Sequence, residues 1–169
     1  MKEVAEIESR AVREEIMNFE AVIGEHPKSF RGDTDICPLR HSFTDGIYVR
    51  EIFIPAGTVL TGKIHKHAHP NFLMVGIVEV ITESGGRETL TAPVSMISEA
   101  GTKRVVHALT DVVWITVHKN KQNITDLDKL EEMIIAPDYK SYHKYIESQD
   151  DIWNRIHTFV KKTIKKLSK

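Results

Sequence analysis

Short segments with strand-forming composition alternate with turn residues through the middle of the chain, and this alternation constrains the fold more than any other feature. Between residues 41 and 119, strands are predicted at 48–54, 72–82, 88–91, 93–98, 104–109 and 112–118. Turn residues separate them, as in Ser84-Gly85-Gly86 and Glu99-Ala100-Gly101. This spacing predicts a mainly β fold, an antiparallel barrel or sandwich, with a final hairpin centred near Thr110.

Both ends of the chain are predicted to be helical. Apolar residues at helical spacing occupy residues 2–24, and residues 25–40 form an expected loop. Two more helical patterns occupy residues 124–169 on either side of Pro137, and Thr125 and Asp128 have the spacing of a capping box. We therefore expect an N-terminal helix and loop at 1–40, a β-barrel at 41–119, and a helical extension at 120–169. The extension is expected to pack on the barrel or on a partner subunit.

Size and composition indicate one compact domain. The chain has 169 residues, a net charge of −1 and one cysteine, Cys37. A disulfide within the chain and a cysteine zinc site are therefore excluded, and we expect Cys37 to be buried and inert rather than a nucleophile paired with His41. The N-terminus lacks the apolar core of a signal peptide, and no apolar run reaches the ~20 residues that cross a bilayer. The expected location is the cytoplasm.

Three of the nine histidines lie at alternate positions, His65, His67 and His69, and this local density favours a metal site. A straight strand would place positions 65 and 69 roughly 13 Å apart, so one ion can bind both only if the chain bends, for which Pro70 with Ala68 and Asn71 is a candidate. At least one further ligand must come from elsewhere in the fold. The alternative is a polar strand end with its histidines in solvent.

The predicted final hairpin supplies candidates for the remaining ligand and for a substrate contact. Centred near Thr110, it places Arg104 opposite Thr116 with His118 on the same face, and it points His107 outward. His118 is therefore preferred to His107 as the extra ligand, although a slip of one residue reverses the choice. An inward Arg104 would favour an anionic substrate, because its planar fork matches carboxylate or phosphate. Otherwise Arg104 would pair with Glu51 or Glu79.

The histidine segment and the strand after it resemble the cupin superfamily over about residues 45 to 118. The strand motif matches Leu73-Met-Val-Gly76-Ile-Val-Glu79-Val, and counting back from Gly76 places two of the family's ligand positions on His65 and His69. The sequence departs from the family pattern at two other ligand positions, where Lys63 and Arg104 stand. The resemblance implies a jelly-roll β-barrel, a divalent metal ion and a homodimer.

A closer resemblance is to short single-domain cupin-like proteins of tailed bacteriophages. The matching pieces are Cys37-Pro-Leu-Arg-His41, Ile54-Pro-Ala-Gly-Thr58, His65-Lys66 with His69, Gly101-Thr-Lys-Arg104 and Trp114-Ile-Thr-Val-His118. If the protein is viral, its expected location is the host cytoplasm.

Two functions remain open. The first is a metal-dependent enzyme acting on a small anionic metabolite, in which His65, His67, His69 and His118 hold Fe, Mn, Ni or Zn. Arg104 and His107 would then contact the substrate, and His67 or His107 could move a proton. The second is a non-catalytic binding or structural module of viral type, which the departures at Lys63 and Arg104 favour.

The C-terminal segment 151–169 carries six Lys and Arg residues against one Asp, a net charge of +5. Its apolar side includes Trp153 and Phe159, and its polar side carries Lys161, Lys162, Lys165, Lys166 and Lys169. We expect an amphipathic helix that packs on the barrel or on a second copy with its lysines in water. Contact with an anionic membrane or a nucleic acid is the less favoured alternative.

Overall fold

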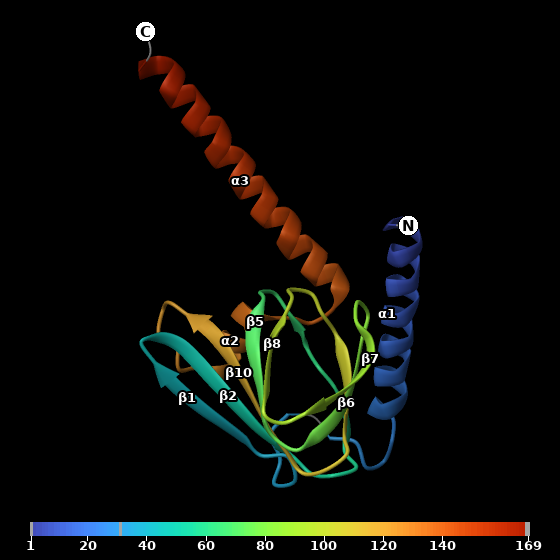
Figure 1. Cartoon of the computed structure of the whole chain (residues 1–169). Helices are drawn as coiled ribbons and strands as arrows, with labels where there is room; N and C mark the ends of the chain where they lie inside the picture. The colour runs from blue at the N-terminus through green and yellow to red at the C-terminus, as the bar shows by residue number, and fades with distance from the viewer. Residues whose placement is uncertain (1, 31, 168–169) are drawn as a thin grey trace.

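The structure, a computed structural model, describes residues 2–30 and 32–167, and for residues 2–8 and 162–167 it describes the backbone alone (Figure 1). In chain order the elements are α1 (Lys2–Gly24), β1 (Leu39–Thr44), β2 (Gly46–Ile54), β3 (Val59–Thr61), β4 (Ile64–His65), β5 (His69–Val75), β6 (Ile77–Thr82), β7 (Gly86–Thr91), β8 (Val94–Ser98), β9 (Arg104–Ala108), β10 (Val112–Asn120), α2 (Leu127–Ile134), β11 (Ile135–Ala136) and α3 (Tyr139–Leu167). The predicted mainly β antiparallel fold with helices at both ends is confirmed.

The strands form two main antiparallel sheets. One has the order β1-β2-β10-β5-β8 and the other β3-β9-β6-β7, while β11 and β4 form a separate pair. From β2 onward the chain passes repeatedly between the two main sheets, and strands distant in sequence become neighbours. This connectivity is that of a jelly roll, a double-sheet architecture that cupins share with lectin and viral capsid domains.

The two sheets pack face to face around one apolar core. That core takes Leu73 and Trp114 from the first sheet, and Val78 and Val106 from the second, all with at most 6% of their surface exposed. Side chains alternate in and out along each strand, so the inward positions of β2, β5 and β10 face the second sheet. The same alternation decides which polar side chains enter the interior.

The predicted hairpin between residues 104–109 and 112–118 is wrong. β9 pairs with β3 and β6 in one sheet, whereas β10 pairs with β2 and β5 in the other. Thr110 and Asp111 therefore connect two sheets, and Thr116 lies opposite Arg50 rather than Arg104. A short connection such as Thr110-Asp111 can join two strands of one hairpin or two strands in different sheets. The residues around it do not decide between these, because the strands that pair with β9 and β10 come from distant parts of the chain.

The predicted strand at 72–82 is also divided. Gly76, with a φ of +95°, separates β5 from β6, and the chain passes there from one sheet to the other. A positive φ is accessible to glycine at little cost because it has no Cβ. The predicted turn at Ser84-Gly85-Gly86 is confirmed, since β6 and β7 pair as a hairpin from Thr82 and Gly86 outward.

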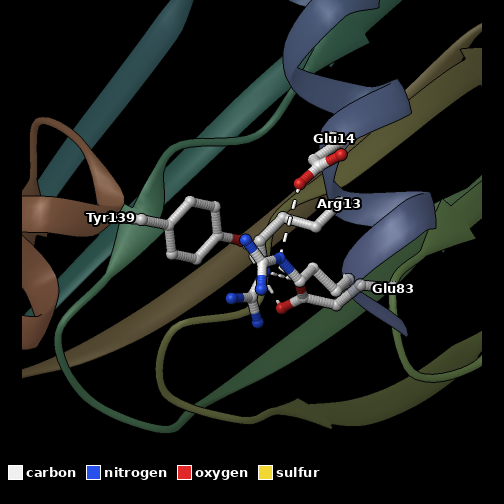
Figure 2. A network of polar contacts seen from close by, with 5 residues as sticks. Arg13, Glu14, Glu83 and Tyr139 are labelled. Carbon is white, nitrogen blue, oxygen red and sulfur yellow. Dashed lines mark hydrogen bonds and ion pairs between the residues drawn. The ribbon is translucent and has the colours of Figure 1, made fainter. Parts of the chain in front are cut away.

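Helix α1 lies along the second sheet and is tied to it and to α3 by a polar cluster (Figure 2). Arg13 pairs with Glu83, in the turn between β6 and β7, and its guanidinium lies 4.2 Å from the ring centroid of Tyr139 at the start of α3. Burial, followed by the charge of Glu83, raises the pKa of Tyr139, which therefore stays protonated. Lys103 and Glu20 make a second tie between α1 and the sheets, with Nζ and Oε1 2.8 Å apart.

The C-terminal extension packs on the sheets through α2, β11 and the first turns of α3. The N-cap of α2 is Asp126, whose side chain accepts a hydrogen bond from the backbone N–H of Lys129, so the predicted capping box at Thr125 is wrong. Beyond its first turns α3 extends away from both sheets (Figure 1). Part of the predicted amphipathic helix lies outside what the structure describes of side chains, namely Lys162, Ile164, Lys165, Lys166, Leu167 and Lys169. Among the described residues, no helix is long and apolar enough to cross a membrane.

Candidate metal centre

Three imidazoles meet at one end of the jelly roll. His65 comes from β4, His69 from the first position of β5, and His118 from an inward position of β10. Each offers one ring nitrogen, and these nitrogens all lie within 4.8 Å of one another. The ring centroids are 4.1 Å apart for His65 and His69, 5.0 Å for His65 and His118, and 4.7 Å for His69 and His118. We call these three residues the histidine cluster.

The chain brings His65 and His69 together because it turns between β4 and β5. Residues 66–68 lie outside both strands, whereas Pro70 lies within β5, opposite Ile97. The predicted bend therefore exists, but it lies before His69 rather than at Pro70. A straight strand would have kept the two imidazoles too far apart to share an ion.

The C-terminal extension holds the strand that carries His65. β11 pairs with β4 so that Ile135 lies opposite His65, and the backbone N–H of Lys66 donates to the carbonyl of Ile134 at 2.7 Å. On the other side, the backbone N–H of Gly101 donates to the carbonyl of His65 at 2.8 Å. His65 is thus positioned by backbone contacts from two segments distant in sequence.

Burial keeps the histidine cluster uncharged. Burial, followed by the nearby His69 and His118, lowers the pKa of His65 to about 2, and burial followed by His69 lowers the pKa of His118 to about 3. Burial is also the main cause of the lowered pKa of His69. At neutral pH all three rings are therefore neutral, which is the form of histidine that binds metal ions.

The hydrogen bonds of the cluster fit a bound metal ion. Nδ1 of His69 lies 3.2 Å from the carbonyl oxygen of His67. Because a carbonyl only accepts, Nδ1 carries the proton and Nε2 keeps its lone pair, the arrangement usual for a metal-binding histidine. Nδ1 of His65 is buried and has no hydrogen-bond partner among the described residues. A buried nitrogen in that state costs free energy unless a ligand satisfies it. The three imidazoles therefore fit the divalent ion that the cupin resemblance implies.

Two half-buried arginines flank the cluster. Burial is the first cause of the lowered pKa of both Arg104, on β9, and Arg50, on β2, and both arginines contribute to lowering the pKa of His65. The Arg104 guanidinium donates to Ser98 Oγ. The alternative ion pairs of Arg104 do not form, since Glu51 pairs with Arg40 and Glu79 with Arg87.

Arg104 is held by a buried polar chain. Nδ2 of Asn71 donates to Ser98 Oγ at 2.7 Å, and Oδ1 of Asn71 accepts from Trp114 Nε1 at 3.0 Å. The guanidinium carbon of Arg104 lies 6.0 Å from the ring centroid of Trp114. Asn71 is 1% exposed, so its amide is satisfied entirely by these neighbours and by the carbonyl of His69. The chain thereby links the position of Arg104 to that of His69.

Arg50 is a site residue that sequence reasoning missed. It lies on β2 between the inward residues Tyr48 and Ile54, and a period of two therefore places it inward as well. An arginine at an inward strand position was the signal that could have found it. Tyr48 is a second missed residue, because it lies opposite His118 across the strands and its ring stacks on that imidazole at 5.9 Å.

His67 lies at the mouth of the cluster rather than in it. It is exposed, its ring lies edge-on to Tyr145 of α3 at 5.6 Å, and its ring nitrogens are 3.3 and 3.4 Å from the Tyr145 hydroxyl. Together with His69, His118 and Lys119 it lines a small pocket beside the cluster.

The structure does not bring His107 to the cluster. Its side chain is 40% exposed on β9, where the buried positions are Val106 and Ala108, and Nδ1 lies 3.4 Å from Glu79 Oε2. It therefore lies on the outward face of the second sheet.

Cys37 and His41 do not form a nucleophile and base. Cys37 is 2% exposed, and burial raises the pKa of its thiol, which keeps it protonated. Nδ1 of His41 lies 2.7 Å from the Tyr48 hydroxyl. The expectation of a buried cysteine is confirmed.

The chain is therefore a jelly-roll β protein with three neutral imidazoles gathered at one end as a candidate metal centre. No family model matches the chain, and no curated protein matches its sequence. In structure the chain is similar to KdgF from Halomonas sp., with 15% identity, a TM-score of 0.47, and coverage of 62% of this chain and 94% of that one. It is also similar to ectoine synthase from P. lautus, with 15% identity, a TM-score of 0.49, and coverage of 70% and 88%.

A third similar structure is a cupin superfamily protein from Desulfitobacterium hafniense, with 5% identity, a TM-score of 0.44, and coverage of 53% of this chain and 83% of that one. These three similarities have low identities and TM-scores, and nothing about activity or ligand is transferred from them to this chain. The jelly roll rests on the strand order of the chain itself.

Proposed function

We propose that this protein binds one divalent metal ion through His65, His69 and His118, and that the centre so formed holds a small anionic ligand. The observation that carries the proposal is the convergence of three neutral imidazoles, those of His69 and His118 buried and that of His65 half-buried, whose nitrogens lie within 4.8 Å of one another. Three protein ligands leave open positions on a metal ion, and such an ion would supply a Lewis acid at the pocket mouth. Imidazole ligands alone do not distinguish Fe, Mn, Ni and Zn.

The positive side chains around the cluster support an anionic ligand. Arg50 and Arg104 lie inside, and Lys119 lines the pocket at the mouth. The cluster itself contributes no negative charge, since its ligand set is three neutral imidazoles. A carboxylate or phosphate would offset this excess of positive charge, and Arg104 presents the planar fork that matches either group.

His67 is the candidate for moving a proton in an enzymatic version of this function. It shares the pocket lining with His69 and His118, and it is exposed to solvent, from which it can exchange protons. Partial burial of the ring, followed by the charges of Lys119 and Lys66, lowers the pKa of His67, so the ring is neutral at pH 7 and can accept a proton.

A non-catalytic binding module of viral type is the second candidate. Lys63, which stands at a ligand position of the cupin motif, is exposed, and its Nζ lies 2.5 Å from Glu131 Oε1. Arg104 stands at another ligand position and donates to Ser98. These two departures from the cupin ligand pattern favour binding without turnover.

Metal analysis of tag-free protein tests the proposed centre. We expect about one equivalent of a divalent metal ion per chain, lost in His65→Ala, in His69→Ala and in His118→Ala. His107→Ala is the matched control, because it removes an imidazole from the outward face of the second sheet, and it should keep the metal. Equal metal content in all four variants would contradict the assignment.

Calorimetric titration of metal-loaded protein with succinate and with inorganic phosphate tests the anionic ligand, with glycerol as the uncharged control. We expect anion binding that weakens about tenfold in Arg104→Met, equivalent to about 1.4 kcal/mol. The methionine keeps an unbranched stem but lacks the charge. Anion affinity that is the same in Arg104→Met and wild type would remove Arg104 from the site.

A further inference from the structure

The outer part of α3 carries an exposed apolar stripe. Its members are exposed by between 36% and 70%, and they are Ile146 (36%), Ile152 (50%), Trp153 (70%), Ile156 (48%) and Val160 (44%). Tyr139, Tyr142 and Tyr145, in the first two turns of α3, contact Arg13 of α1, Gly101 and His67. Beyond them the helix extends away from both sheets (Figure 1). An apolar stripe of this length on a helix is normally covered by another element.

The spacing of the stripe is that of a helix that packs on another helix. The repeat alternates steps of three and four residues through positions 146, 149, 153, 156, 160, 163 and 167. Ile, Trp, Ile, Val and Leu occupy 146, 153, 156, 160 and 167, and Ile152 lies beside this seam. This is the heptad repeat of a coiled coil, in which a second helix covers the seam. Gln149 and Thr163 are the polar exceptions.

The charges along α3 indicate which helix would cover it. Residues 147–151 hold three acidic side chains and no Lys or Arg, while residues 155–166 hold five Lys and Arg and no acid. Two copies side by side in the same direction would place like charges together. In opposite directions, the acidic stretch of each copy would lie beside the basic stretch of the other.

We infer that α3 pairs with α3 of a second copy of this chain, antiparallel, with Trp153 of one copy opposite Ile156 of the other. In this register position 147 lies level with position 162 of the second copy. Asp150 lies level with position 159, within one turn of Lys161. The helix extends beyond the sheets of its own chain, so a second α3 can lie along it (Figure 1). An anionic membrane is the less suitable partner, because Glu147, Asp150 and Asp151 would face repulsion from its headgroups.

The mass of the full chain in solution, measured by light scattering and sedimentation equilibrium, tests the pairing. We expect a dimer that dissociates in Trp153→Glu and persists in the matched control Thr158→Glu, which places the same charge on the opposite face of the helix. Unchanged far-ultraviolet circular dichroism and metal content in both variants would show that the sheets are intact. A monomeric wild-type chain, or a dimer that survives Trp153→Glu, would overturn the inference.

Cysteine cross-linking tests the direction. Gln149→Cys and Val160→Cys occupy facing positions in the antiparallel register, so the mixture of the two variants should form a mixed disulfide dimer that neither forms alone. Efficient cross-linking of each variant with itself would overturn the antiparallel arrangement. Cys37, 2% exposed, does not compete. Binding of a monomeric chain to phosphatidylserine vesicles would instead identify a membrane as the partner and overturn the pairing.

Discussion

At the scale of single residues, burial sets the chemistry of His65 and His118. An exposed histidine is partly protonated near neutral pH, whereas these two titrate at about 2 and about 3 because the folded chain removes them from water. The neighbouring arginines add to the effect by opposing a further positive charge. Protons therefore compete weakly with a metal ion for these nitrogens over the physiological pH range.

The same pKa shifts predict how the stability of the metal-free protein depends on pH. In the unfolded chain both histidines have pKa values near 6.5, so below about pH 6.5 the unfolded state binds more protons than the folded state. The free energy of unfolding should be at its full value above that pH. As the pH falls toward 3, it should decrease by about 1.4 kcal/mol per pH unit for each histidine. Denaturant titrations with a chelator, from about pH 8 to about pH 5, measure this slope.

The control for this slope is substitution of the titrating rings. His65→Gln combined with His118→Gln should reduce the loss of stability on acidification, whereas His107→Gln, outside the cluster, should leave it in place. An identical slope in wild type and in the double variant would show that burial does not hold these rings neutral.

At the scale of elements, α2 and β11 complete the site. Leu130 and Ile134 of α2 form a small buried cluster with Tyr48, which stacks on His118. Ile134 also lines the pocket, and β11 pairs with the strand that carries His65. The C-terminal extension therefore supports two of the three clustered histidines.

Leu130→Ala tests this support. Leu130 is 1% exposed, and removing a buried leucine side chain typically costs about 2–5 kcal/mol. Because α2 positions β11 and Tyr48, we expect weaker metal binding together with a lower midpoint of thermal unfolding. Leu127→Ala, at a position on the same helix that is 43% exposed, should change neither quantity. Metal affinity that stays unchanged in Leu130→Ala would separate the extension from the site.

At the scale of the whole molecule, the fold depends on the places where the chain passes between sheets. Gly76 is such a place, and its φ of +95° is combined with close packing. A Cβ built on it would lie 2.2 Å from the carbonyl oxygen of Asp111, in the connection from β9 to β10. Two connections between the sheets therefore meet at one glycine.

Gly76→Ala should destabilise the whole jelly roll. The matched control is Gly57→Ala, whose φ of +80° is similar but whose Cβ would meet nothing within 4 Å. We expect the control to lose about 1–2 kcal/mol from backbone strain alone. Gly76→Ala should lose several kcal/mol more, because backbone atoms there must also move. Chemical denaturation of both variants measures the difference, and equal losses would show that the close approach is unimportant.

The amino-acid sequence by itself determined the local elements of this protein. Strand composition, turn glycines and apolar spacing predicted the β-rich middle and both helical ends, because these signals act over a few neighbouring residues. The density of His65 and His69 likewise indicated where a candidate metal centre would begin, since both belong to one short segment.

Only the tertiary structure decided which distant strands became neighbours. Residues 104–118 have the local features of a hairpin, yet β9 and β10 lie in opposite sheets. His118 reaches the cluster because β10 lies between β2 and β5, and Arg50 enters with it on β2, while His107 is left on the outward face. Strand pairing depends on which side chains become buried and in which register each strand meets its neighbours. Both are determined by contacts among all the strands of the core and not by any one short segment.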